Sequence, residues 1–468
     1  MTRHVHFLGI CGYATSGAAL LARAQGDRVT GSDDFAYPPV TDVVTAAGIE
    51  WENRSDPANL DRWGVPDLVV VGNQTRPQNP ELQAVLERRL PHTSEIEFYV
   101  ALASDRLRLV VCGTHGKTTT SALLAYMLAR AGTDPGFRLG STSFDLGGSA
   151  RLGTGPFVFE GDEYTTAPWD RRPKFVHTRP HAACVTRLEW DHPDVYPSLA
   201  AYRAPFIDLV RSMPAEALLA LCADDAECAA LGEHASSRVV TYGVAPSSDW
   251  RIHDVSGGGE LQRFRVERVD STPLDVALTF PGEHNACNAC AALILATFAG
   301  VPVETAVAAC ASFRGPARRF EVLGEANSVT VVDDYAHHPT EVGAAIDAAR
   351  QRYVGRRIVA IHTPHTYSRT RTMLDDYRQS FRRADVVVLG PIEEARERGQ
   401  EATVSSDDVA LRVGPTRDVH VVGSSAEAIQ LLCRLAHPGD VMLVLSLGGF
   451  DKLAPRLLHA LGAAHAHA

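Results

Sequence analysis

The stretch Gly113-Thr114-His115-Gly116-Lys117-Thr118-Thr119-Thr120 decides the fold of this 468-residue chain. It follows an apolar strand pattern over Arg108–Cys112 and precedes an alanine- and leucine-rich helical pattern over 121–131. A glycine loop between a strand and a helix is typical of phosphate binding, because glycines admit phosphate close to backbone N–H groups and the helix N-terminus adds positive potential. The lysine can reach the outer phosphates and the Thr118 hydroxyl can bind Mg²⁺. The strict motif has a glycine where Val111 stands, so the loop is a shortened form that predicts nucleotide binding.

Outward from this loop, short apolar strands alternate with helical patterns along the whole chain. Such continuous apolar strands indicate parallel sheets covered on both faces by helices. The turn-rich segment 313–316 marks a boundary. We therefore predict an α/β fold of three domains: 1–104, 105–315 and 316–468. The expected strands are 5–8, 28–31, 67–72, 108–112, 157–160, 182–186, 329–332, 358–361, 386–389 and 441–444, with further β-structure over 250–280. The expected helices are about 15–24, 121–131 and 290–298, and the Ala/Gly/His-rich end, 461–468, is expected to fray.

Composition narrows the class of protein. The chain is 45% hydrophobic and 22% charged, as in globular proteins, and its net charge of −11 argues against nucleic acid and anionic membranes as partners. No apolar run approaches the roughly 20 residues of a membrane span, and no signal peptide is recognised. Nine cysteines are scattered, several in apolar runs (Cys11, Cys184, Cys310, Cys433), which favours reduced thiols and a cytoplasmic protein.

Acidic residues follow the strand pattern that ends at Phe159. Glu160 comes first, and Asp162 and Glu163 come next. Carboxylates at the carboxyl end of a strand beside a phosphate loop are well placed to bind Mg²⁺, although the same residues alone would form an ordinary solvated turn. Asp191-His192 ends a later strand pattern, where His192 is either a second metal ligand or, as a lone histidine more commonly is, a structural residue.

Several motifs then occur in one order along the chain. They are Gly-Thr-His-Gly-Lys-Thr-Thr (113–119), Glu-Gly-Asp-Glu (160–163), Asp-His (191–192), Pro-Gly-Glu-His-Asn-Ala-Cys-Asn-Ala (281–289), Arg-Arg-Phe-Glu (318–321) and Asp-Asp-Tyr-Ala-His-His-Pro (333–339). This ordered set resembles the Mur ligases, the ATP-dependent amide-forming enzymes of peptidoglycan synthesis. The resemblance implies a Rossmann-like N-terminal domain that binds a UDP substrate, a central phosphate-loop ATPase and a Rossmann-like C-terminal domain that closes on ATP and the amine.

The resemblance also implies roles for individual residues. The uridine diphosphate would meet Gly9, Gly12, Ser32 and Asp33, and a glycine turn with an acidic residue after the second strand suits a diphosphate and a ribose. Thr118, Glu160 and His192 match the magnesium ligands. Residues matching the ATP site are Gly113, Thr114, His115, Gly116, Lys117, Thr118, Thr119, His284, Asn285, Asn288, Arg319 and Asp334.

The third domain would supply residues for the amine. Tyr335, His337 and Arg369 match positions near the amine in the branch of the family that adds L-alanine, although Arg369 also reads as a solvated helix arginine. The residues implied as catalytic are Lys117, His192, Arg319 and His337, with His337 as the group that accepts a proton from the amine.

The implied reaction joins an amine to the carboxylate of UDP-N-acetylmuramate through an acyl phosphate, with ATP and Mg²⁺. Two branches compete for the amine, an amino acid or a peptide. Segments 163–177, 188–192 and 446–450 are similar to the branch that adds the tripeptide L-Ala-γ-D-Glu-meso-diaminopimelate in cell-wall recycling, whereas 364–371 is similar to the L-alanine branch. The longer central likeness favours the tripeptide. A ligase of a specialised pathway and a catalytically silent nucleotide-binding protein stay open, because Arg187 stands where the family usually has Asn and Thr165 where the tripeptide branch has Asp. The oligomeric state stays open.

Overall fold

The computed structural model describes residues 2–36, 40–193, 195–269, 271–399, 401–415 and 417–464. The chain divides into two compact units. The first unit holds Met1–Glu189, Arg203–Trp250 and Cys290–Ala309, and the second holds Trp190–Tyr202, Arg251–Ala289 and Cys310–Ala468. The boundaries predicted near residues 104 and 315 stay predictions.

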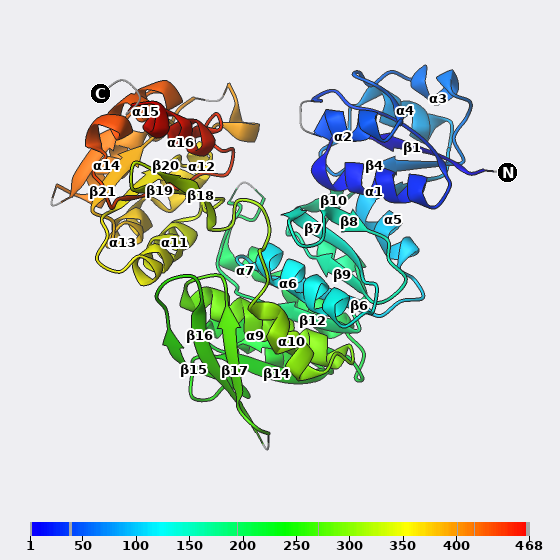
Figure 1. The fold of residues 1–468 in the computed structure, drawn as a ribbon. Coiled ribbons are helices and arrows are strands. Elements are labelled where there is room, and N and C mark those ends of the chain that lie inside the picture. Colours follow the sequence, from blue (N-terminus) through cyan, green and yellow to red (C-terminus); the bar gives the residue numbers. More distant parts are fainter. Residues whose placement is uncertain are drawn as a thin grey trace. The chain divides into compact units, whose positions relative to one another are not determined.

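The first unit opens with a parallel five-stranded sheet in the order β3-β2-β1-β4-β5, the strand order of a doubly wound fold (Figure 1). Its strands form because apolar, β-branched runs such as Leu68–Val71 are buried between covering helices. The strands are β1 (His4–Leu8), β2 (Arg28–Ser32), β3 (Glu50–Glu52), β4 (Leu68–Val71) and β5 (His92–Ser94). The helices are α1 (Tyr13–Ala24), α2 (Val40–Ala46), α3 (Asn59–Arg62), α4 (Pro80–Glu87) and α5 (Glu95–Leu102).

The strands of the central sheet that lie in the first unit run in the order β14-β13-β12-β6-β9-β7-β8. All these neighbours are parallel except the hairpin of β7 with β8. The strands are β6 (Arg108–Cys112), β7 (Gly136–Ser143), β8 (Gly148–Arg151), β9 (Phe157–Glu160), β12 (Ala182–Val185), β13 (Leu218–Cys222) and β14 (Arg238–Gly243), with a separate hairpin of β10 (Thr165–Ala167) and β11 (Asp170–Pro173). The helices are α6 (Lys117–Arg130), η1 (Lys174–His177), α8 (Ala226–Ala229), η2 (Ala230–His234) and α10 (Val303–Cys310).

Three helices have residues in both units: α7 (Leu199–Ser212), α9 (Glu283–Phe298) and α10, whose last residue, Cys310, belongs to the second unit. Helix α9 begins seven residues before the predicted start at 290, and α6 begins at Lys117 rather than at 121. The α6 prediction was wrong because Gly116 ends the loop with a φ of +80° and the polar threonines 118–120 form the buried first turns of the helix. The lysine and Thr118 therefore stand on the helix N-terminus itself.

The second unit is built on a six-stranded sheet in the order β18-β19-β23-β20-β21-β22, parallel except for the pair β18–β19 (Figure 1). The strands are β18 (Glu321–Ala326), β19 (Val329–Asp334), β20 (Ile358–His362), β21 (Val386–Leu389), β22 (Asp418–Val421) and β23 (Val441–Leu445). The helices are α11 (Pro339–Arg352), α12 (Tyr367–Thr372), η3 (Leu374–Asp376), α13 (Tyr377–Ser380), η4 (Ala395–Glu397), α14 (Ser406–Val413), α15 (Ser425–Leu435) and α16 (Leu453–Ala464). This unit also holds β15 (Trp250–Ser256) except for its first residue, β16 (Gln262–Arg268) and β17 (Leu274–Leu278).

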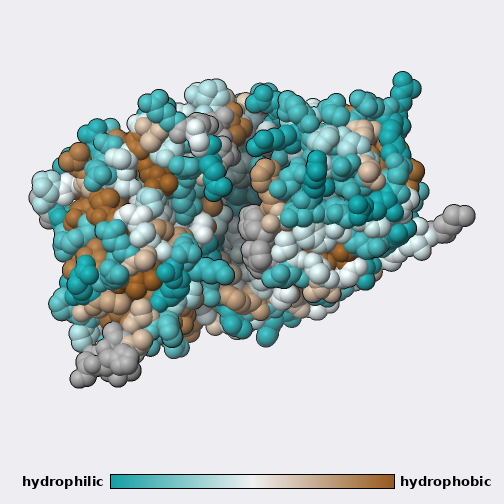
Figure 2. All heavy atoms as spheres, turned by 90° about the horizontal axis from the view of Figure 1, so that it is seen from above, coloured by the Kyte–Doolittle hydropathy of each residue, from teal (hydrophilic) through white to brown (hydrophobic). Residues whose placement is uncertain are grey.

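The α/β architecture predicted from the sequence is confirmed. Helix α16 continues through 461–464, where fraying was expected, and the remaining residues of that prediction, 465–468, lie outside the described part of the chain. Cys11, Cys184 and Cys310 are buried as expected, while Cys433 is half-buried. Over the described ranges, none of the helices combines the length and apolar character that a membrane crossing requires. The face drawn in Figure 2 is mostly hydrophilic, with its hydrophobic residues in separate groups.

Candidate active site

The phosphate loop joins β6 to α6 in the first unit. Gly113 has a φ of +123°, and a Cβ there would lie 2.4 Å from Thr186 Oγ1 and 2.8 Å from the carbonyl oxygen of Arg187, so only glycine fits. The N–H of Thr114 donates to the carbonyl of Arg187 at 2.8 Å, and its hydroxyl donates to the carbonyl of Glu189 at 2.8 Å. The segment 186–189 therefore fixes the shape of the loop from the neighbouring strand end.

Lys117 lies over this loop. Its Nζ donates to the carbonyls of Gly113 at 2.7 Å and Thr114 at 3.0 Å, and it pairs with Glu163 Oε1 at 2.7 Å. Burial alone would lower the pKa of Lys117, but the nearby carboxylates, Glu163 foremost, raise it above its ordinary value. The side chain is therefore a fixed positive charge at the mouth of the loop, as contact with phosphate requires.

Thr118 and Glu160 lie together, as the magnesium assignment requires. The Thr118 hydroxyl donates to Glu160 Oε1 at 2.6 Å, and the N–H of Gly140 donates to Glu160 Oε2 at 2.6 Å. A hydroxyl beside a buried carboxylate at a phosphate loop is an all-oxygen donor set, which Mg²⁺ prefers. These two residues fit the ion, whereas His192 belongs to the second unit and its metal role stays a prediction.

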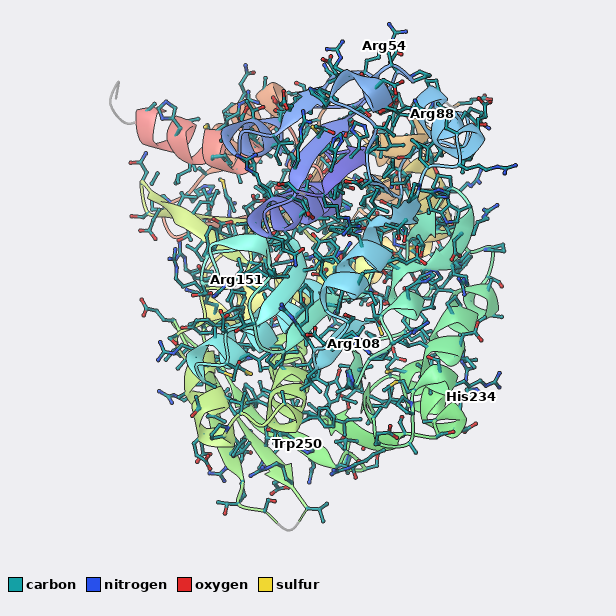
Figure 3. The ribbon with its side chains drawn as sticks, turned by 90° about the vertical axis from the view of Figure 1, so that its right-hand side faces the viewer. Arg54, Arg88, Arg108, Arg151, His234 and Trp250 are labelled. Atoms are coloured by element: carbon teal, nitrogen blue, oxygen red, sulfur yellow. The ribbon has the colours of Figure 1, made fainter. Side chains whose placement is uncertain are left out.

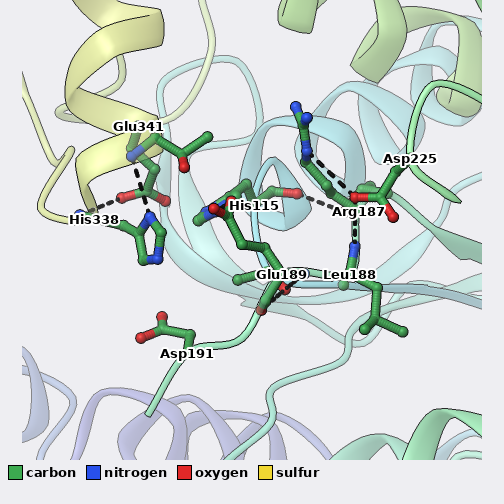
Figure 4. A network of polar contacts seen from close by, with 12 residues as sticks. His115, Arg187, Leu188, Glu189, Asp191, Asp225, His338 and Glu341 are labelled. Carbon is green, nitrogen blue, oxygen red and sulfur yellow. Dashed lines mark hydrogen bonds and ion pairs between the residues drawn. The ribbon is translucent and has the colours of Figure 1, made fainter. Parts of the chain in front are cut away.

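His115 within the loop and Arg187 on the neighbouring segment each contact an acidic side chain (Figure 4). His115 Nε2 lies 2.9 Å from Glu189 Oε2, so this histidine is tied to the segment after β12. The half-exposed Arg187 points to Asp225, with its Nε 3.4 Å from Oδ2. The departure from the family's Asn thus places its side chain on Asp225, while its backbone carbonyl still supports Thr114.

The residues predicted for the uridine diphosphate also gather in the first unit. Gly9 has a φ of +74° and its N–H donates to the carbonyl of Ser32. The Asp33 carboxylate accepts from the N–H of Cys11 and of Phe35, each at 2.8 Å, and so shapes the turn that holds Gly9 and Gly12. The hydroxyl of Ser32 donates to the buried Glu81 at 2.7 Å. Asp33 therefore organises the glycine turn in addition to the ribose role implied for it.

In the second unit, Arg369 is buried with 2% of its surface exposed, so the reading as a solvated arginine is wrong. Its Nε and Nη2 each lie 2.8 Å from Asp191 Oδ1, its Nη1 lies 3.0 Å from His365 Nδ1 and its Nη2 lies 3.2 Å from His192 Nδ1. Burial alone would raise the pKa of Asp191, but the charge of Arg369 holds it well below the usual range. His192 has a left-handed backbone, with φ of 54°.

A ring cluster adjoins Arg369. The rings of His337 and His365 lie 5.8 Å apart, and Tyr335 lies 5.6 Å from His337. Burial lowers the pKa of His337 to about 3, so the ring is neutral near pH 7. Its Nδ1 lies 3.1 Å from the carbonyl of Tyr335, which assigns the proton to Nδ1 and the lone pair to Nε2. His337 is therefore in the protonation state of a base, but a weakly basic one.

Asp334 and Arg319 lie beside this cluster. The Asp334 carboxylate accepts from the N–H of Phe320 and of Ala336, each at 2.7 Å, and burial raises its pKa to about 6 against the opposing charge of Arg319. The guanidinium of Arg319 lies 4.7 Å from the ring centroid of Tyr335, a cation–π contact. The loop that carries Arg319 is thus pinned to the end of β19.

The remaining predicted nucleotide residues open α9. Asn285 donates to the carbonyl of Pro281 at 2.7 Å, and Asn288 donates to Asn285 Oδ1 at 3.2 Å. Both asparagines are buried, and His284 precedes them on the first turn of the helix. They are linked to each other, and their contact with ATP stays a prediction.

Three further residues were not assigned roles from the sequence. Asp191 and His365 stand next to assigned motifs, and their position beside His192 and within 364–371 was the only signal. Arg138 has no such signal, because an arginine within a β-strand pattern usually reads as solvent-exposed. It is buried, with 2% of its surface exposed.

Comparison with known proteins matches most of the chain to one family. Residues 4–106 match the model "Mur ligase family, catalytic domain", 111–296 match "Mur ligase middle domain" and 318–448 match "Mur ligase, glutamate ligase domain". The chain is 38% identical to a UDP-N-acetylmuramate–L-alanine ligase of Chloroflexus aggregans, over 99% of this chain and all of that protein, and 37% identical to one of a Roseiflexus species, over 98% and 99%.

Solved structures give the same family. A murein peptide ligase from Psychrobacter arcticus is 33% identical with a TM-score of 0.72, over 98% of this chain and 99% of that one. A UDP-N-acetylmuramate-alanine ligase from Thermotoga maritima is 25% identical with a TM-score of 0.79, over the same shares of the two chains.

Proposed function

The chain belongs to the Mur ligase family, whose members are ATP-dependent ligases, and we propose that it joins L-alanine to the carboxylate of UDP-N-acetylmuramate. The observation that carries the ligase chemistry is the phosphate loop, in which Lys117 is held charged over Gly113 and Thr114. The substrates are small molecules, and we place the protein in the cytoplasm, where its buried cysteines stay reduced.

An amide forms from a carboxylate only after the carboxylate is activated. The lactyl carboxylate attacks the γ-phosphorus of ATP, giving an acyl phosphate and ADP, and the neutral amine then attacks the acyl carbon and releases phosphate and a proton. Lys117 stabilises negative charge on the transferred phosphoryl group, and we assign Arg319 the same role. Thr118 and Glu160 would hold Mg²⁺, which supplies positive charge to the phosphates. His337 would accept the proton of the amine.

Part of the evidence for L-alanine as the amine comes from the second unit. The residues that match the alanine-adding branch, Tyr335, His337 and Arg369, gather with His365 in one cluster. Six relatives that are 34–38% identical to the chain carry the name UDP-N-acetylmuramate–L-alanine ligase. Both observations support L-alanine.

The tripeptide favoured from the sequence is the second candidate. It is supported by the similarity of segment 163–177 to the tripeptide branch of the family. It is also supported by the 33% identity between the chain and the murein peptide ligase. However, Lys174 within that segment is buried, with 3% of its surface exposed, and it pairs with Glu95 at 2.9 Å. The similarity at Lys174 therefore reflects a residue that packs inside the protein. It is weaker evidence for the identity of the amine than the cluster around Arg369.

Phosphate release from ATP and UDP-N-acetylmuramate, measured with L-alanine or with the tripeptide, tests the proposal. Release with L-alanine alone supports it, and release with the tripeptide alone transfers the assignment to the second candidate. No release with either contradicts both. Lys117→Ala is the control, since turnover that survives this change would remove the role given to the loop.

A further inference from the structure

A cluster of four charges, three of them buried and one half-buried, lies in the first unit, outside the residues assigned to substrates. Arg138 on β7 and Lys174 at the start of η1 are the cations, and Glu95 at the start of α5 and Asp162 after β9 are the anions. Lys174 Nζ lies 2.9 Å from Glu95 Oε2 and 3.8 Å from Asp162 Oδ2. Arg138, Lys174 and Glu95 are each no more than 3% exposed, so the cluster is closed to water on most sides.

Arg138 uses its whole guanidinium group here. Nε lies 3.2 Å from Glu95 Oε1, Nη2 donates to Asp162 Oδ2 at 2.9 Å and Nη1 donates to the backbone carbonyl of Glu160 at 2.8 Å. Only a planar fork with several donors reaches three acceptors in this way. Two exposed arginines of the same unit, Arg88 and Arg151, are labelled in Figure 3. Each instead pairs with a single surface carboxylate, Asp61 and Asp134 respectively.

The acceptors of Arg138 belong to the turn that carries the predicted metal and lysine contacts. Within 160–163, Glu160 faces Thr118, Asp162 faces Arg138 and Glu163 faces Lys117. Three residues of the turn therefore each contact a different side chain outside it. The chain has three lysines, and two of them take part in these contacts. Lys117 pairs with Glu163 of the turn, and Lys174 pairs with Glu95.

Stability does not explain such a cluster. Replacing a buried ion pair by apolar side chains of similar volume is often neutral or stabilising, because the desolvation of the charges is costly. What the charges provide is a fixed geometry, since an ion cluster with several hydrogen bonds tolerates one arrangement of the turn. The geometry that is fixed is that of Glu160 and Glu163.

We propose that Arg138 is a positioning residue of the ligase: together with Lys174 and Glu95 it fixes the turn 160–163, so that Glu160 faces Thr118 and Glu163 faces Lys117 where the magnesium nucleotide binds. The inference rests on the proposed function for the identity of that ligand. Arg138 acts through its hydrogen bonds to the backbone carbonyl of Glu160 and to the side chain of Asp162.

The test measures binding of a fluorescent, non-hydrolysable ATP analogue while Mg²⁺ is varied. Arg138→Lys keeps the charge but cannot reach all three acceptors. We expect the dissociation constant, and the Mg²⁺ concentration at half-saturation, to rise about tenfold or more, the usual effect of removing a residue that orients a metal ligand. The double change Arg138→Met with Glu95→Gln removes one charge of each sign, so it gives a second reading if a single change folds poorly.

Val69→Ala is the matched control. Val69 is fully buried in β4 of the same unit and is remote in sequence from the turn, so its truncation lowers the unfolding midpoint without moving Glu160. Its affinity for the analogue should equal that of the wild type. Wild-type affinity and Mg²⁺ requirement in both arginine variants would overturn the inference alone, whereas a wild-type protein that binds no nucleotide would overturn the proposed function and the inference together.

Discussion

Asp191 and Arg369 lie 178 residues apart in the sequence and form a buried ion pair in the second unit, with Nε and Nη2 of Arg369 each 2.8 Å from Oδ1 of Asp191. The pair fixes the residue that follows Asp191. His192 has a left-handed backbone, a conformation that costs a non-glycine residue free energy and persists only where its surroundings hold it. The arginine contacts both residues and so orients the Asp-His motif.

Arg369→Ala should destabilise the second unit by about 3–5 kcal/mol, because it leaves the carboxylate of Asp191 buried without its partner. Urea denaturation measures this change. Arg382→Ala is the matched control, since Arg382 pairs with Asp347 at the surface and its loss should cost less than about 1 kcal/mol. Equal effects of the two changes would mean that the Asp191–Arg369 pair is open to water in solution.

His362 should make the second unit sensitive to acid. It is fully buried on β20, where its Nδ1 lies 3.0 Å from the carbonyl of Leu445 and its Nε2 has no hydrogen-bond partner among the described residues. Burial lowers its pKa from 6.5 to about 4. Below pH 6.5 His362 becomes protonated in the unfolded chain, whereas in the folded chain it stays neutral until about pH 4. The free energy of unfolding therefore falls as the pH drops from 6.5 to about 4.

The difference of 2.5 pH units between the two pKa values corresponds to a loss of about 3 kcal/mol in the free energy of unfolding. Urea midpoints measured between pH 7.5 and pH 4.5 follow the upper part of this pH window. His362→Asn keeps a donor for the carbonyl of Leu445 and removes the titrating ring. The difference between wild type and variant isolates this histidine from buried acids such as Asp334, whose raised pKa gives a slope of the opposite sign. Parallel pH profiles for the two proteins would contradict the assignment.

Thr118→Val should remove the effect of Mg²⁺ on nucleotide binding. Valine has nearly the shape of threonine but lacks the hydroxyl that faces Glu160. We expect affinity for an ATP analogue to fall about tenfold or more when Mg²⁺ is present and to change little when it is chelated. Thr118→Ser restores the hydroxyl and should restore binding. If the valine variant keeps the full benefit of Mg²⁺, Thr118 is not a ligand.

Ten strands were predictable because they are local patterns, whereas others, such as β7 and β13, were not predicted. Arg108–Cys112 is an apolar run between polar segments, and the observed strand has the same bounds. Glycine loops between such runs and helices were equally visible. The start of α6 was not, because threonine has low helix propensity and only burial of residues such as Thr120 in the folded unit overrides it.

The side-chain partners were less predictable than the elements. Nothing local connects Asp191 to Arg369 or Arg138 to Glu95, since the fold alone brings these residues together. The same limit affects the acceptor. A likeness over 163–177 says which residues are shared but not where they point, and Lys174 points into an ion cluster. Family membership was therefore readable from ordered motifs, while the choice between L-alanine and the tripeptide depends on the packing of single side chains.

Gly140→Ala should separate the metal site from the stability of the fold. A Cβ at Gly140 would lie 2.5 Å from Oε1 and 3.0 Å from Cδ of Glu160, whose carboxylate must then move. The backbone of Gly140 does not have a positive φ, so alanine is tolerated there and only the end of the glutamate side chain yields. We therefore expect a melting temperature close to that of the wild type, with a Mg²⁺ requirement for nucleotide binding raised about tenfold.

Gly148→Ala is the matched control for this change. Gly148 lies on β8, the hairpin partner of the strand that carries Gly140, and a Cβ there meets only the carbonyl of Ala150 at an ordinary 3.9 Å. This variant should bind the ATP analogue with the wild-type Mg²⁺ requirement. The added carbon at Gly140 displaces the Glu160 carboxylate and little else. If the magnesium titrations of both glycine variants coincide with that of the wild type, the position of this carboxylate does not matter for Mg²⁺ binding.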